Sequence, residues 1–305
     1  SFSGMTKLEV LYLIDNLISE IPPNSFSDLS SLYKLNLDNN SILSLGGESF
    51  AGLTTLQYLY LSDNEISAIA DTAFSQLESI NYLYLNNNKI VDINSSWFLT
   101  LTTLKALYLG NNNISQINSS AFENNVNITT LDLSSNGITD IEIGEFDNFT
   151  HEIKIDLQNN LITYVQAEVF LGLLDSSEVL LAYNFLNPTA GSDDVLEIDE
   201  VRANGITVDI SSQKQYTITL DANGGWVNQL INNIFYHGEV VTLPVSNPPS
   251  GKAFIGWDVD GNGTRDTSQG EYTLAPFPPD TFGSSLDLTF YAVYEQLVTN
   301  ILVEP

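Results

Sequence analysis

The chain has 305 residues and an acidic balance, with 9 lysines and arginines against 38 aspartates and glutamates and a formal net charge of −29. Because phosphate backbones and anionic membrane surfaces attract clustered basic residues, this balance argues against binding of nucleic acid or of anionic membranes. The absence of cysteine excludes thiol chemistry, zinc ribbons and disulfide-closed caps. No stretch reaches the roughly 18 consecutive apolar residues of a membrane helix, so no membrane insertion is expected.

The first part of the chain repeats with a period of 24 residues. Its most regular members are the asparagines Asn16, Asn40, Asn64, Asn88, Asn112, Asn136, Asn160 and Asn184. An aliphatic residue follows each of the first seven by five positions, and a phenylalanine follows each by ten. Such a period predicts a solenoid, in which each repeat buries its apolar face against its neighbours.

Each repeat reads LxxLxLxxNxL, as at Leu32–Ile42 and Leu56–Ile66. This pattern resembles the leucine-rich repeat family in its 24-residue form. The resemblance implies a mainly β fold with α/β solenoid character, a horseshoe whose LxL strands pair as one parallel concave sheet. Strand alternation turns the leucines inward, and we expect the asparagine amides to satisfy the turn after each strand. The phenylalanines predict a second, purely structural column on the convex side.

The solenoid is expected to span residues 1–187, with eight repeats and a truncated start. The last two repeats drift, because Glu152 and Ser176 occupy leucine positions. Residues 188–212 then read as a C-terminal cap. A helix is predicted from Ser192 or Asp193 to about Ala203, with Gly205 as its stop, and a strand follows over 206–210. The acidic residues of this helix are expected to form a solvated face: Asp193, Asp194, Glu197, Asp199 and Glu200.

Residues 213–296 lose the 24-residue period and predict a second, all-strand domain. Alternating segments lie at 216–225, 239–244, 253–257 and 286–295, with turns rich in glycine, proline and asparagine between them. The order YTITLDANGG, YHGEVVTLP, GKAFIGWDVDGNG and LDLTFYAVYE resembles the Listeria–Bacteroides repeat, or internalin B-repeat, except that Tyr294 stands where that family usually has tryptophan. The resemblance implies a small β-grasp-like module, followed by a tail or linker over 297–305. Trp226, Trp257 and Tyr291 are interpreted as core or half-core aromatics.

Leucine-rich repeats joined to this module resemble internalin-like bacterial surface proteins. The resemblance implies a secreted or wall-attached protein, extracellular or at the cell surface. Its repeats would serve recognition and its β-grasp module would serve as a spacer or adhesive arm.

The concave face is the predicted binding surface, because solenoid curvature presents it as an extended platform. Two columns of strand residues point there, and tyrosines concentrate in the first five repeats. Exposed tyrosines supply rigid, amphipathic contact area, although tyrosine also favours strands and repeat duplication copies residues. The candidate ligand-binding residues are Tyr12, Tyr33, Tyr58, Tyr60, Tyr82, Tyr84, Tyr108, Asp132 and Asp156.

No motif in the sequence indicates a catalytic site, and we expect that the protein is not an enzyme. His151 and His237 fall in different domains, and no nucleophile elbow, phosphate loop or paired metal motif occurs. Asp132 and Asp156 are neighbours on an open sheet rather than an enclosed carboxylate pair.

One acidic turn has the oxygen spacing of a calcium loop. The candidate ligands of a weak Ca²⁺ site are Asp258, Asp260, Asn262, Thr264 and Asp266. Gly263 holds the required sixth position, but Gln269 stands at the twelfth, where a bidentate glutamate belongs. A polar, glycine-rich hairpin turn is the alternative interpretation.

The sequence therefore favours a recognition or adhesion protein that binds a protein or glycan on its concave tyrosine-rich face. The alternative is a structural subunit of a surface layer or extracellular filament. If Ser1 is the true start, Leu8, Leu11 and Leu13 lack a covering cap, and self-association through that end of the solenoid is expected.

Overall fold

The computed structural model describes residues 2–117, 120–230, 234–236, 239–250, 252–258, 270–273 and 285–296. The chain divides into two compact units. The first unit comprises Ser1–Asn184 and Pro188–Ser212, and the second comprises Phe185–Asn187 and Gln213–Pro305.

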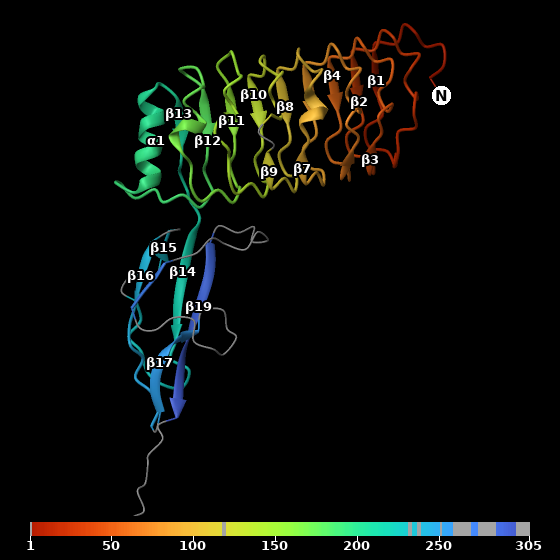
Figure 1. Ribbon diagram of the computed structural model, residues 1–305. Helices are drawn as coiled ribbons and strands as arrows, with labels where there is room; N and C mark the ends of the chain where they lie inside the picture. Colours follow the sequence, from red (N-terminus) through yellow and green to blue (C-terminus); the bar gives the residue numbers. More distant parts are fainter. Residues whose placement is uncertain are drawn as a thin grey trace, which may run out of the picture. The chain divides into compact units, whose positions relative to one another are not determined.

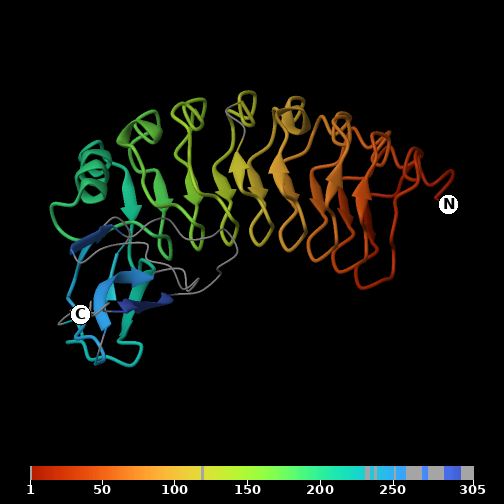
Figure 2. The same ribbon diagram turned by 60° about the horizontal axis from the view of Figure 1, so that its bottom comes forward.

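The first unit is a solenoid whose successive turns each add one strand to a parallel sheet (Figures 1 and 2). Within the described residues this sheet has nine strands, in the order β1-β2-β4-β6-β8-β10-β11-β12-β13. Their bounds are Val10–Tyr12, Lys34–Asn36, Tyr58–Tyr60, Tyr82–Tyr84, Ala106–Tyr108, Thr130–Asp132, Lys154–Asp156, Glu178–Leu180 and Thr207–Asp209. The predicted mainly β solenoid with a parallel sheet is confirmed.

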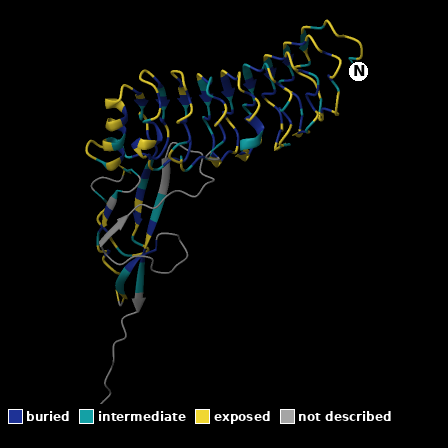
Figure 3. Cartoon of the chain, turned by 45° about the horizontal axis from the view of Figure 1, so that its top comes forward, coloured by how far each residue is buried: buried dark blue, intermediate teal, exposed yellow. Residues whose placement is uncertain are grey.

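The middle residue of each strand points into the solenoid, because alternate residues of a strand face opposite sides. Leu35, Leu59 and Leu83 are each 0 % exposed. Burying such a side chain stabilises the fold by about 1.5–3 kcal/mol. Figure 3 shows the resulting buried residues recurring through every turn, so the core of this unit runs along its length.

The asparagines form the predicted ladder between turns. Asn88 is typical: its Nδ2 donates to the carbonyls of Leu61 and Leu85 at 2.9 and 3.0 Å, and its Oδ1 accepts the N–H of Ile66 at 3.0 Å. From Asn40 to Asn184 the ladder residues are at most 8 % exposed. Their amides therefore satisfy buried backbone groups of two successive turns, and the structural role predicted for them is confirmed.

The residue before each ladder asparagine lies in the left-handed region of the backbone. The φ angles run from 53° to 60° in Asp15, Asn39, Asp63, Asn87, Asn111, Ser135, Asn159 and Tyr183. Aspartate, asparagine and serine tolerate this conformation because their short polar side chains bond locally. Tyr183 is the exception in this column, and its bulky side chain is 47 % exposed.

The side opposite the sheet is held by stacked phenylalanines and short extended segments. Phe50, Phe74, Phe98 and Phe122 follow one another with ring centroids 6.1 to 6.4 Å apart. The short segments are β3 (Ser44–Leu45) paired with β5 (Ala68–Ile69), β7 (Asp92–Ile93) paired with β9 (Gln116–Ile117), and the 3₁₀ turns η1 (Ser95–Phe98) and η2 (Ala167–Val169). The predicted second apolar column is present.

The C-terminal cap has the predicted helix, α1 (Asp193–Ala203), and the predicted strand, β13, which joins the sheet beside β12. Ser192 caps the helix by accepting the N–H of Val195 at 3.3 Å, and Gly205 follows with φ +84°. The prediction that the acidic residues of this helix form a solvated face is wrong in part. Asp194 is only 8 % exposed, and Glu197 accepts the N–H of Ala167 at 2.8 Å, because the helix packs against η2. Across the described residues, no helix is long and apolar enough to cross a membrane.

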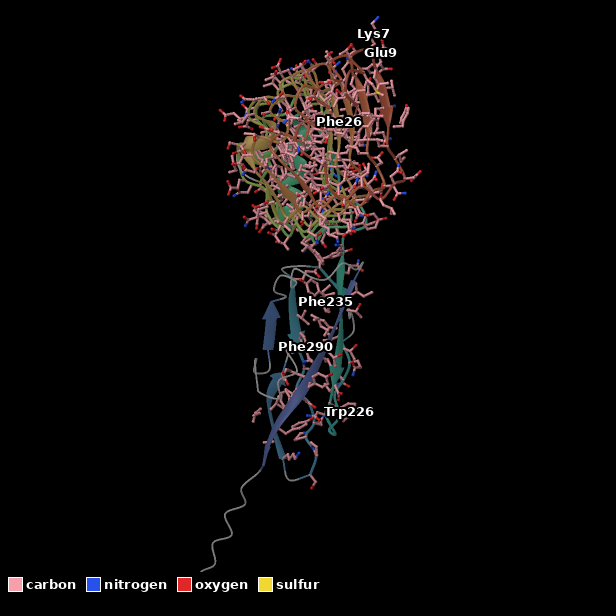
Figure 4. The ribbon with its side chains drawn as sticks, turned by 90° about the vertical axis from the view of Figure 1, so that its right-hand side faces the viewer. Lys7, Glu9, Phe26, Trp226, Phe235 and Phe290 are labelled. Atoms are coloured by element: carbon pink, nitrogen blue, oxygen red, sulfur yellow. The ribbon has the colours of Figure 1, made fainter. Side chains whose placement is uncertain are left out.

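In its described residues, the second unit contains the four strands predicted for it, together with two short ones. Its larger sheet has the order β15-β14-β19-β17, in which β14 and β19 run parallel and the outer strands run antiparallel to them. The bounds are β14 Gln215–Asp221, β15 Ile234–Phe235, β17 Lys252–Asp258 and β19 Ser285–Gln296, and β16 Val240–Leu243 pairs with β18 Gly270–Thr273. Alternating residues of β14 pack with Trp257 and Phe290 as the core. Figure 4 labels Phe290, which lies on β19.

The assignment of three second-unit aromatics to the core or half-core holds for Trp257, is marginal for Tyr291 and is wrong for Trp226. Trp257 is 0 % exposed, whereas Trp226 is 60 % exposed and Tyr291 is 39 % exposed. Trp226 pairs by its backbone with Asn247 at an isolated bridge, which leaves its ring outside the sheet. Tyr294 is partly buried, and its hydroxyl donates to the Ala222 carbonyl at 2.6 Å, so tyrosine anchors this position with a hydrogen bond.

Candidate functional site

The outward-pointing residues of the nine-stranded sheet form two columns, which together we call the sheet face. The strand registers align them, and each member faces its neighbours in adjacent turns. The first column is Val10, Lys34, Tyr58, Tyr82, Ala106, Thr130, Lys154, Glu178 and Thr207. The second column is Tyr12, Asn36, Tyr60, Tyr84, Tyr108, Asp132, Asp156, Leu180 and Asp209.

Five tyrosines of the sheet face stand in stacks. Tyr60, Tyr84 and Tyr108 have ring centroids 4.5 and 4.6 Å apart and interplanar angles of 4° and 3°. Tyr58 and Tyr82 stack beside them at 4.8 Å and 2°. The spacing follows from the separation of parallel strands, about 4.8 Å. Tyr84, which has a ring on each side, therefore hides both of its faces and presents its edge and hydroxyl to the outside.

The stack is interrupted toward the N-terminus, where Asn36 separates Tyr12 from Tyr60. A lysine fills the gap: the ammonium of Lys34 lies 5.5 Å from the ring centroid of Tyr12 and 5.0 Å from that of Tyr60. Both distances are within the range of cation–π attraction. Burial alone would lower the pKa of Lys34, but Tyr60 and Tyr12 outweigh that effect and the pKa is raised.

Carboxylates replace tyrosines after the fifth repeat. Asp132 follows Tyr108 in the column, and its Oδ1 accepts the N–H of Ser134 at 2.9 Å and the Oγ–H at 2.7 Å. Asp156 is the next member, and its Oδ1 accepts the N–H of Gln158 at 3.0 Å. Each carboxylate is thus fixed by the turn that follows its own strand.

The acidic end also contains one ion pair, between Lys154 and Glu178 at 3.0 Å. Asp209 extends the second column through its register with Leu180. The two columns beyond Tyr108 therefore hold Asp132, Asp156, Glu178 and Asp209 against the single ammonium of Lys154.

The titration of the sheet face reflects its packing and its negative charge. Burial, reinforced by Tyr108, raises the pKa of Tyr84, and burial, reinforced by Asp132, raises the pKa of Tyr108. Burial raises the pKa of Asp156 against the opposing hydrogen bond from Gln158, and Asp132 raises it further. Tyr84 and Tyr108 therefore stay neutral at neutral pH, and Asp132 lies close enough to Asp156 to raise the pKa of Asp156.

The structure brings eight of the nine predicted ligand-binding residues into the two columns. Tyr12 is 58 % exposed and stands before the stack. Tyr33 lies outside the columns, just before β2, and its carbonyl accepts the N–H groups of Gln57 and Tyr58. Its ring is 38 % exposed, so it flanks the sheet face rather than lining it.

Two members of this surface were not among the predicted residues. Lys34 is the first: it lies 22 residues after Tyr12 and 26 before Tyr60, so that a tyrosine ring from each adjacent turn lies near its ammonium. Asp209 was missed because 29 residues separate it from Leu180, so the 24-residue period does not reach it. The alternation of Thr207, Val208 and Asp209 after the cap helix was the available signal that this strand joins the sheet and presents Asp209 on its face.

The proposed calcium turn lies almost wholly outside the described residues. Asp258 ends β17 and is 3 % exposed. Asp260, Asn262, Thr264 and Asp266 fall outside the described ranges. Among the residues that the structure describes, no three histidine, aspartate or glutamate side chains are grouped to hold a metal ion.

The leucine rich repeat family matches residues 1–42, 30–90 and 81–138. These segments are leucine-rich repeats, as the LxxLxLxxNxL pattern predicts. Among solved structures, a chain in "Crystal structure of TLR13-ssRNA13 complex" is similar, with 26% sequence identity and a TM-score of 0.45. The match covers 57% of this chain and 28% of that chain. No curated protein matches the sequence.

Proposed function

We propose that this chain is a non-enzymatic recognition protein, extracellular or at the cell surface, that binds a protein or glycan ligand on its sheet face. The observation that carries the proposal is the tyrosine stack of β4, β6 and β8, five rings held rigid by one another on an open face. Because these rings are already ordered, binding costs little side-chain entropy, and tyrosine is a frequent anchor of interfaces.

The leucine-rich repeats support a recognition role, because a solenoid presents a long platform without a catalytic cavity. The net charge of −29 favours a protein or glycan over a nucleic acid as the ligand. We assign the second unit the role of a β-grasp-like spacer or adhesive arm. Its first and last long strands, β14 and β19, pair in parallel over seven residues, which is consistent with that assignment.

The test is a binding screen of the chain on a glycan array and on an array of extracellular protein domains. Substituting Tyr60, Tyr84 and Tyr108 with serine should abolish the bound signals while leaving circular dichroism unchanged, since these rings point away from the core. A matched control replaces exposed apolar residues off the sheet face, Leu43, Val91 and Leu99, with serine. Retained binding by the tyrosine variant, or equal loss by the control, would place recognition elsewhere on the chain.

A further inference from the structure

The tyrosine stack offers ring faces only at its two ends. Tyr84 is covered on both sides, by the parallel rings of Tyr60 and Tyr108 with centroids 4.5 and 4.6 Å away, so a ligand meets only its edge and hydroxyl. The end rings differ, because one side of each has no tyrosine beside it. These ends are where the rings' negative π faces are available to a ligand.

At the N-terminal end the chain itself shows what such a face binds. The ammonium of Lys34 lies over Tyr60 and Tyr12 at 5.0 and 5.5 Å from the ring centroids. The end face of the stack is therefore occupied by a cation where the column of tyrosines is broken.

At the C-terminal end the corresponding faces have no aromatic ring beside them. Tyr82 is followed in its column by Ala106, and Tyr108 is followed by Asp132, so neither has a ring beyond it. Within the described part of the chain, cations lie over rings of Tyr12, Tyr60 and Phe185, but not over Tyr82 or Tyr108. This end lacks the positive charge that its counterpart has.

Negative charge stands beside the outer face of Tyr108. Asp132 and Asp156 each engage one carboxylate oxygen with their own turn, which leaves the second oxygen for a partner. The only ammonium in the two columns at this end, that of Lys154, is paired with Glu178. A carboxylate next to a ring face is the arrangement that an arginine side chain satisfies, since its planar guanidinium stacks on the ring while donating to the oxygens.

Building on the proposed recognition function, we propose that the Tyr108–Asp132–Asp156 junction binds an arginine side chain from a basic segment of a protein partner. The guanidinium stacks on the outer face of Tyr108 and donates N–H groups to Asp132 and Asp156. The binding mirrors that of Lys34 at the other end of the stack, with the cation supplied by the partner. The excess of carboxylates along β10 to β13 draws in the rest of the basic segment.

The probe is a fluorescent peptide that alternates arginine and serine, titrated by anisotropy against the intact chain at about 20 and about 150 mM salt. Two control peptides have lysine or glutamine in place of arginine. We expect the arginine peptide to bind most tightly, the lysine peptide more weakly and the glutamine peptide most weakly. Asp132→Asn, Asp156→Asn and Tyr108→Ser should each weaken the arginine peptide by about tenfold. Tyr108→Phe should keep affinity, because it keeps the ring face.

Asp92→Asn is the matched control, since it removes the same charge from an exposed residue of β7, outside the sheet face. If Asp92→Asn weakens binding as much as Asp132→Asn, the attraction is general and the site is overturned. Unchanged affinity of Tyr108→Ser, with its fold verified by circular dichroism, overturns it as well. If the arrays reveal a ligand that depends on Tyr60, Tyr84 and Tyr108 while the arginine peptide fails to bind, recognition by the sheet face stands and this site falls.

Discussion

The amide oxygen of Asn88 accepts the backbone N–H of Ile66 in the preceding turn, at 3.0 Å. The same amide donates to carbonyls of both turns. The Asn88 side chain therefore links its own turn to the preceding one. The same link recurs along the solenoid and keeps the regular spacing at which the tyrosines stack.

The first prediction concerns that coupling. Asn88→Ala should lower the free energy of unfolding by about 2–4 kcal/mol, because it leaves the buried carbonyls of Leu61 and Leu85 and the N–H of Ile66 without partners. Asn16→Ala is the control. Its amide bonds to Leu13 and Ile14 in an exposed turn, so the loss should stay below about 1 kcal/mol. Urea unfolding followed by circular dichroism measures both, and equal losses would contradict the buried ladder.

The tyrosine stack was predictable from sequence because a period fixes register. Once Tyr60, Tyr84 and Tyr108 occupy the same repeat position, parallel pairing must place them side by side, whatever their role. The same logic gave the phenylalanine column and the buried asparagines. The 24-residue period does not, however, predict which charged side chains contact which rings. The cation–π contact of Lys34 depends on the gap that Asn36 leaves in the tyrosine stack.

The residues whose environment differs from the prediction lie where the 24-residue period stops. Trp226 was assigned to the core or half-core by residue type but is 60 % exposed, because in a domain without repeats the sequence pattern does not say which sheet face is covered. Asp194 and Glu197 were assigned to solvent by charge, whereas the cap helix packs against η2 and brings Glu197 to the N–H of Ala167. Both errors concern tertiary contacts between segments of different kinds, which residue type and local alternation leave undetermined.

A second prediction tests the cation at the N-terminal end of the stack. Lys34→Met keeps the aliphatic stem but removes the ammonium over Tyr12 and Tyr60, and it should cost about 0.5–1 kcal/mol. Lys105→Met is a suitable control, because Lys105 is exposed and has no ring under its ammonium among the described residues. Thermal unfolding at low salt compares the two. An equal shift in Tm would mean that charge alone, and not the rings, is responsible.

Tyr183 supports a third prediction, because it occupies a left-handed position with φ 59° that asparagine holds in the preceding turn. Tyr183→Asn should raise the free energy of unfolding by about 1 kcal/mol, since asparagine tolerates this conformation better than tyrosine. The reciprocal change, Asn159→Tyr, should destabilise, and it also loses the Asn159 bond to Ser135 at 3.2 Å. Urea midpoints moving in the same direction for both variants would contradict the strain argument.

The last prediction concerns pH and the buried carboxyl of Glu145. This residue is 4 % exposed on the side opposite the sheet, Oε1 has no hydrogen-bond partner, and Oε2 accepts only a long bond of 3.4 Å from the N–H of Glu142. Burial raises the pKa of Glu145 from 4.5 to about 7, and the neighbouring charge of Glu142 adds to that effect.

The folded state therefore holds this proton more tightly than the unfolded state. Below the unfolded pKa of 4.5 the carboxyl is protonated in both states and causes no loss. As the pH rises to about 7, only the unfolded state ionises, so stability falls across that window and then levels off. Glu145→Gln cannot ionise and serves as the reference. As the pH rises from 4.5 to 7, the unfolding free energy of the wild type should fall by on the order of 2 kcal/mol relative to that of Glu145→Gln. Urea titrations at half-unit pH steps would show it, and parallel curves for the two proteins would mean that Glu145 titrates normally.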